Sequence, residues 1–99
     1  MAPRGAPIQA PGSGMVTSAG WEAGYGQTVT IDHGYGVVTK FAHASKLLVR
    51  RGERVKRGDR VALVGNTGLA TGPHLHYEVI VNGRPVDPLR YVLPDNITR

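Results

Sequence analysis

The chain has 99 residues, of which 40% are hydrophobic and 19% are charged, and its net charge is +5. This length allows one small domain, and the composition is that of a folded globule rather than a disordered tail. The absence of cysteine excludes disulfides and thiolate metal sites, which leaves His, Asp and Glu as the strong metal ligands. No apolar run approaches the roughly 20 residues of a membrane-spanning helix, and the first residues lack the apolar segment of a signal peptide.

Short strands joined by tight turns are predicted along the whole chain, because 14 glycines and 7 prolines are spread evenly through it. A short pair of strands is expected around residues 11–14, followed by a hairpin whose turn is His33-Gly34-Tyr35. The strongest turn signal is Asn82-Gly83, since both residues tolerate positive φ. The predicted strands cover residues 8–10, 15–18, 27–32, 36–43, 61–65, 75–81 and 84–86.

The predicted fold is therefore all-β, with antiparallel strands and one short helical turn at 89–91 after Asp87-Pro88. Residues 5–16 and 52–65 share a weak rhythm of glycines and short strands, which would suit the two halves of a flattened β-sandwich. We expect a single domain over 1–99, with a frayed tail at 94–99.

A basic stretch accounts for much of the positive charge. A net positive chain would suit nucleic acid, anionic lipid or an anionic wall polymer. Glycines and acidic residues interrupt the stretch, so it indicates the solvated side of a turn-rich hairpin, and no interleaved aromatic residues favour base stacking. The basic residues are Arg50, Arg51, Arg54, Lys56, Arg57 and Arg60.

The segment that carries chemistry runs from Thr71 to Val79. Alternate side chains of a strand share a face, so His74, His76 and Glu78 are expected to point one way, and Leu75, Tyr77 and Val79 toward the core. Imidazoles about 6.6 Å apart along a strand can turn toward one point. That arrangement suits two metal ligands, or one ligand beside a proton-handling group, or simply a solvated polar row.

Two further histidines differ in their expected roles. His43 shares strand parity with Val37, Thr39 and Phe41, so it is expected near the face that carries His74 and His76. His33 falls in the predicted hairpin turn after Asp32, where stabilising the turn is a simpler role than binding a metal.

The order of six motifs resembles the lysostaphin/LytM-type zinc metalloendopeptidases, which cut bacterial peptidoglycan, and the match runs over residues 5–93. The resemblance implies a β-sandwich of the duplicated hybrid kind, with His76 as a zinc ligand and His43 and His74 acting on the water and the oxyanion. It implies Zn²⁺ as cofactor, peptidoglycan peptides as substrate, and the cell envelope, periplasmic or extracellular, as location. The motifs are residues 31–36 (IDHGYG), 41–45 (FAHAS), 55–59 (VKRGD), 65–68 (GNTG), 72–79 (GPHLHYEV) and 86–88 (VDP).

The chain departs from that family upstream of these motifs. The family supplies two more zinc ligands there, a His followed four residues later by an Asp, but no His precedes His33 and no Asp precedes Asp32. We expect an N-terminally incomplete domain whose missing segment would precede Ala2. By itself the chain is then a weak or inactive peptidase, and zinc held through His74 and His76, helped by Glu78 or His43, would be weakly bound.

Three other hypotheses stay open from the sequence. A metal-free relative could bind cell wall or regulate a wall hydrolase without cutting. A biotinyl- or lipoyl-type carrier would need an exposed modified lysine, for which Lys40, Lys46 and Lys56 are the mid-chain candidates. A role on nucleic acid rests on charge alone and is not expected. Strand edges left exposed by truncation could also pair with a second copy.

Overall fold

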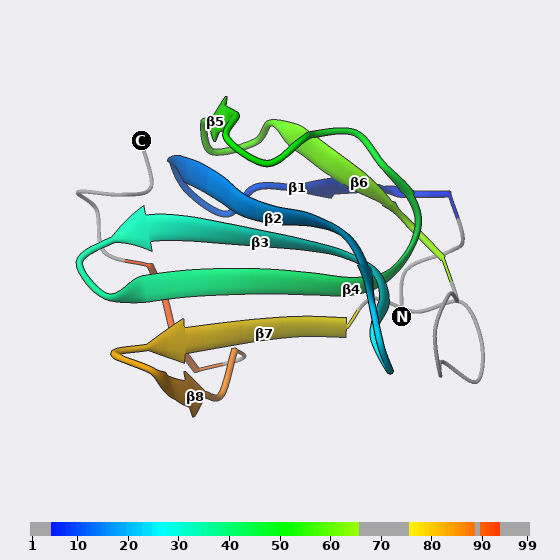
Figure 1. Ribbon diagram of the computed structural model, residues 1–99. Coiled ribbons are helices and arrows are strands. Elements are labelled where there is room, and N and C mark those ends of the chain that lie inside the picture. The colour runs from blue at the N-terminus through cyan, green and yellow to red at the C-terminus, as the bar shows by residue number, and fades with distance from the viewer. Residues whose placement is uncertain (1–4, 66–75, 89, 94–99) are drawn as a thin grey trace.

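The computed structural model describes residues 5–65, 76–88 and 90–93, and within these ranges the chain is all-β without a helix (Figure 1). The strands are antiparallel to their neighbours, which confirms the predicted fold class. None of the described residues forms a helix that could span a membrane. The strands are β1 (Pro7–Gln9), β2 (Gly14–Glu22), β3 (Gly26–Gly34), β4 (Val37–Leu47), β5 (Arg54–Val55), β6 (Arg60–Val64), β7 (His76–Val81) and β8 (Arg84–Val86).

The strands form one curled sheet around a single main core. Its path is β1-β6-β4-β3-β2-β5, and β7 joins it through β4 and carries β8 at its outer edge (Figure 1). Every strand from β1 to β6 contributes a buried apolar residue, so the curl closes around these side chains. The main cluster is Ile8, Ala10, Val16, Val29, Ile31, Phe41, Ala44, Val55, Val61, Ala62 and Val64.

The expected pairing of the first two strands is wrong. β1 pairs with β6, while β2 pairs with β3 along most of its length and with β5 at Gly14 and Met15. The reason lies at Ala10, whose amide donates to the Asp59 carbonyl at 2.8 Å and whose carbonyl accepts from Gly58 at 2.9 Å. Because the turn before β6 uses these groups, the chain after β1 crosses to the other side of the curl instead of folding back.

The two predicted hairpins, β3–β4 and β7–β8, both form, but the β3–β4 turn lies later in the chain than predicted. Asn82 and Gly83 have φ of 51° and 79° and join β7 to β8 as predicted. The β3–β4 turn is made by Tyr35 and Gly36, with φ of 55° and 76°, so His33 belongs to β3 and not to the turn.

The basic stretch matches the prediction, whereas the predicted helical turn at 89–91 is not seen as a helix in the described residues and the chain end is described only in part. All six basic residues from Arg50 to Arg60 are exposed, around turns and short strands. Near the C-terminus the amides of Arg90 and Tyr91 both donate to the Asp87 carbonyl, at 3.0 and 3.1 Å, while the predicted helical residue Leu89 and the tail at 94–99 lie outside the described residues. Leu93 is buried against Val37.

We expect Gly65→Ala to destabilise the fold by about 1–3 kcal/mol, because a methyl group there would lie within 2.6 Å of the Ser45 Cα and Cβ. Gly20→Ala is the matched control, since a methyl group at Gly20 in β2 would meet nothing within 4 Å. Urea unfolding measures both variants. Equal stability of the two would contradict the close approach of β4 and the end of β6.

Candidate active site

Strand β4 changes its partner at His43. Its first part, from Val37 to Ala42, pairs with β7, and its last part, from Ala44, pairs with β6. His43 stands between the two pairings with a left-handed φ of 59° and only 7% of its surface exposed. A left-handed backbone costs a residue with a Cβ about 1–3 kcal/mol and persists where its surroundings enforce it.

A hydrogen bond from the β2–β3 turn holds this backbone. The His43 amide donates to the Tyr25 carbonyl at 2.8 Å, and the Tyr25 amide donates back along its own turn to the Glu22 carbonyl at 3.0 Å. The left-handed conformation also interrupts the strand alternation, since Phe41, Ala42, His43 and Ala44 are all buried in succession. Parity with Val37 and Thr39 is therefore not a valid guide to the orientation of His43.

The strand that carries the predicted histidine pair lies beside His43. Ala42 of β4 is the register partner of His76, so His43 and His76 are one position apart on neighbouring strands, which are spaced about 4.8 Å. Tyr77 stacks on Phe41 with ring centroids 5.0 Å apart, and Val79 is fully buried, as predicted for the core side of β7. His74, Leu75 and the side chain of His76 lie outside the described residues, so the common orientation of His74 and His76 stays a prediction.

His33 is a satisfied structural residue in β3. It is 5% exposed, and its Nδ1 lies 2.7 Å from the Ser13 carbonyl and its Nε2 2.7 Å from the Thr39 hydroxyl. A carbonyl only accepts, so Nδ1 carries the proton and Nε2 accepts from Thr39. Burial lowers the pKa of His33, against smaller opposing effects of the Ser13 bond and the Asp32 charge. Both ring nitrogens are used, which leaves none for a metal.

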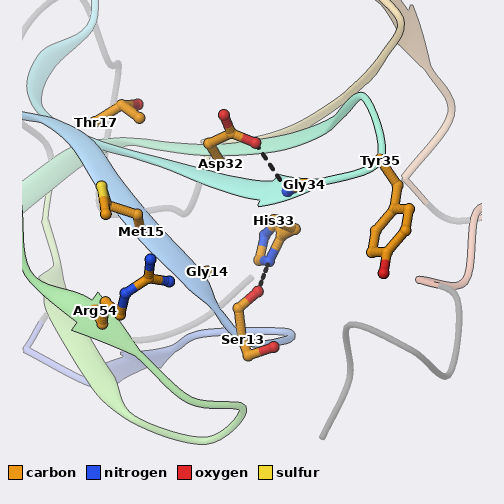
Figure 2. A pocket seen from close by; sticks show the side chains of 9 residues that line it. All are labelled: Ser13, Gly14, Met15, Thr17, Asp32, His33, Gly34, Tyr35 and Arg54. Carbon is orange, nitrogen blue, oxygen red and sulfur yellow. Dashed lines mark hydrogen bonds between the residues drawn. The ribbon is translucent and has the colours of Figure 1, made fainter.

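An open pocket of about 370 Å³ adjoins His33 (Figure 2). It lies at the β3–β4 turn, whereas His43 is more than half-way along β4 toward the other end. This pocket is therefore separate from the paired strands at His43 and His76. Its lining residues are Ser13, Gly14, Met15, Thr17, Asp32, His33, Gly34, Tyr35 and Arg54.

The described residues do not make up a zinc site. Among residues 5–65, 76–88 and 90–93, no three His, Asp or Glu side chains are grouped so that they could hold a metal ion. The zinc ligand expected in this chain is His76, whose side chain is outside that set. A complete three-ligand centre is thus not formed by the described part alone.

Lys40, which the sequence offered only as a candidate carrier lysine, lies on β4 three residues before His43 and belongs to a charged group. The Lys40 ammonium is 2.9 Å from the Glu22 carboxylate and 4.1 Å from the centroid of the Tyr25 ring. Lys40 is also the register partner of Glu78 in β7. Glu22 and Lys40 are 18 residues apart, so no local pattern could have linked them.

Comparison with known proteins identifies relatives over nearly the whole chain. The family described as Peptidase family M23 matches residues 1–88. The peptidoglycan DD-endopeptidase ShyA of Vibrio cholerae is 46% identical over 92 residues, which are 93% of this chain and 21% of that protein. The chain spans about a fifth of the length of the curated relatives it matches.

Solved structures agree in fold. A zinc-containing peptidase from Vibrio cholerae superposes with a TM-score of 0.89 at 43% identity, over 94% of this chain and 29% of that one. The catalytic domain of lysostaphin from Staphylococcus simulans gives a TM-score of 0.83 at 32% identity, over 90% of this chain and 71% of that one. The curled sheet is thus shared with peptidases of known structure.

We expect the His33 imidazole to titrate below pH 6.5, because burial lowers its pKa from that value. As the pH falls, the unfolded chain, with the ordinary pKa, binds the proton first, so acid weakens the folded state. The stabilisation by neutral His33 is complete above pH 6.5 and is lost as the pH falls through the folded-state pKa. NMR titration of the ring measures this pKa directly.

Urea unfolding near pH 7 and near pH 5 provides the control for that titration. The carboxylates titrate alike in the parent chain and in His33→Gln, so the difference between their pH slopes isolates His33. The parent chain should lose more stability on acidification than the variant. A ring that titrates at or above pH 6.5, or equal slopes, would contradict the assignment.

Proposed function

The chain belongs to peptidase family M23, and from that membership we propose that it is the C-terminal part of a zinc metalloendopeptidase that hydrolyses peptide cross-links or stem peptides of bacterial peptidoglycan. Relatives named as peptidoglycan DD-endopeptidases and as a zinc-containing peptidase support the substrate and the metal. Peptidoglycan lies outside the cytoplasmic membrane, which points to the periplasmic or extracellular side of the envelope. The whole of residues 1–99 would belong to one catalytic domain.

One observation carries the proposal for the site. Ala42 pairs with His76, which sets the strand of the predicted histidine pair beside a buried histidine in a strained backbone. Strained, buried polar residues concentrate at functional sites, where the surrounding fold maintains them. The partner change of β4 accounts for the left-handed backbone, but a glycine would adopt it without strain, so the presence of a histidine there supports a role for its side chain.

The proposed roles divide among three histidines. His76 is a zinc ligand, while His43 and His74 handle the proton of the attacking water and the charge on the carbonyl oxygen. General acid–base catalysis by a positioned imidazole contributes about 10²–10⁴-fold, and donors aimed at the oxyanion add a similar factor. Zinc, when bound, supplies Lewis-acid polarisation of the scissile carbonyl.

The chain by itself is proposed to be weakly active. Catalytic zinc usually has three protein ligands and an open position, and the resemblance assigns only His76 of this chain to that set. Zinc bound through one imidazole, with help from His74, Glu78 or His43, would exchange readily. The upstream His and Asp of the family would complete the centre in a longer chain.

We expect the natural gene product that contains this segment to cleave cross-linked muropeptides in the presence of zinc, and residues 1–99 alone to cleave them slowly or not at all. His43→Asn should lower kcat about 10²–10⁴-fold with little change in KM. Asparagine suits this test because it tolerates a left-handed backbone better than most residues. Release of muropeptide fragments is followed by chromatography.

A chelator should abolish this cleavage, and Lys46→Met on the exposed part of β4 should leave it unchanged. Cleavage that survives the chelator, or that His43→Asn leaves intact, would refute the proposed site. Binding of the longer chain to peptidoglycan without any cleavage would instead favour the second candidate, a metal-free module that binds wall or regulates wall hydrolases.

A further inference from the structure

Three residues from two segments form a compact clamp above the β2–β3 turn. Glu22 ends β2, Tyr25 lies in the turn, and Lys40 reaches them from β4. The Lys40 ammonium sits 2.9 Å from the Glu22 Oε1 and 4.1 Å from the Tyr25 ring centroid. The lysine side chain is only 17% exposed, so solvent screens this contact less than it would screen an ordinary surface ion pair.

The clamp acts on the same turn that holds His43. Tyr25 presents its ring to Lys40 and its carbonyl to the His43 amide. Gly24 and Gly26 flank Tyr25 with φ of 81° and 73°, a backbone that glycine adopts without strain and from which it departs just as easily. Contacts to the Tyr25 side chain therefore contribute to the placement of the Tyr25 carbonyl.

Lys40 and His43 belong to the same strand, but only Lys40 lies in the part of it that pairs with β7. Lys40 lies in the part that pairs with β7, opposite Glu78, and His43 follows the end of that pairing. The contact between the Lys40 ammonium and the Tyr25 ring connects the β2–β3 turn to the part of β4 that pairs with β7. The turn then constrains the residue at which β4 passes from pairing with β7 to pairing with β6.

We infer that Lys40 is a positioning residue: through the Tyr25 ring it holds the carbonyl that fixes the left-handed backbone of His43. Its importance for catalysis rests on the proposed function, whereas its effect on the His43 backbone does not. Lys40 is not assigned any contact with substrate. The clamp is Glu22, Tyr25 and Lys40.

Amide hydrogen exchange, read by NMR on this chain, tests the backbone effect. Lys40→Met keeps the length of the side chain but removes its charge, and we expect the His43 amide to exchange about tenfold faster. Lys40→Arg retains a cation that stacks on an aromatic ring, so its rate should stay within about threefold of the parent rate. Glu22→Gln should give an intermediate rate, because the contact with Tyr25 remains.

Lys46→Met is the matched control, a lysine of the same strand that is exposed and lies beyond the partner change. It should leave the His43 exchange rate unchanged, and the amide of the core residue Ile31 should not respond to Lys40→Met. An unchanged His43 rate in Lys40→Met would overturn the inference. Equal acceleration at Ile31 would also overturn it, because the effect would then be global unfolding.

Kinetics of the natural gene product test the catalytic consequence. Lys40→Met should lower kcat about tenfold with KM nearly unchanged, and Lys40→Arg should restore most of the loss. Fast exchange at His43 combined with full kcat would overturn the positioning role in the reaction. If the parent protein cleaves nothing, the proposed function fails, and the exchange rates alone still decide whether Lys40 holds His43.

Discussion

Strand β4 serves two neighbours in turn, β7 up to Ala42 and β6 from Ala44, and the residue between them cannot follow the regular ladder of either. His43 meets this demand with a left-handed backbone, which is unfavourable for any residue with a Cβ. The Tyr25 carbonyl accepts from its amide, and the closed curl of the sheet buries it. The change from pairing with β7 to pairing with β6, which leaves the end of β7 beside His43, takes place at this one residue.

The buried histidines of the described part illustrate how environment divides roles between identical side chains. At His33 both ring nitrogens are paired, and burial outweighs the opposing Asp32 charge and favours the neutral ring. The residue therefore links β3 to Ser13 and to β4. His43 is buried at the partner change of β4, next to Ala42, which is the register partner of His76. The first is a crosslink of the fold, and the second is proposed to serve the chemistry of the family.

Ion pairs on protein surfaces usually contribute little to stability, and even the half-buried Glu22–Lys40 pair is a single contact. Its significance lies in where it acts, because the same lysine also contacts the Tyr25 ring in a turn flanked by two left-handed glycines. A contact of modest free energy can still contribute to the geometry of a turn whose glycines adopt several backbone conformations. The clamp would therefore matter more for the order of the site than for the stability of the domain.

Local patterns in the sequence determined several turns, core residues and exposed residues of this protein, and its family. Turn propensity located Asn82-Gly83, strand alternation assigned Tyr77 and Val79 to the core, interleaved glycines marked the basic stretch as solvated, and six ordered motifs indicated the family. These properties depend on residues that are only a few positions apart, so they can be recognised in the sequence without the tertiary structure.

Only the tertiary structure decided the pairing of β1 with β6, the break in alternation at His43, and the contacts of His33 with Ser13 and of Lys40 with Glu22. Each joins residues that are distant in the chain or results from competition between two strands for one partner. Closure of the curled sheet settles that competition, and no short stretch of sequence contains it.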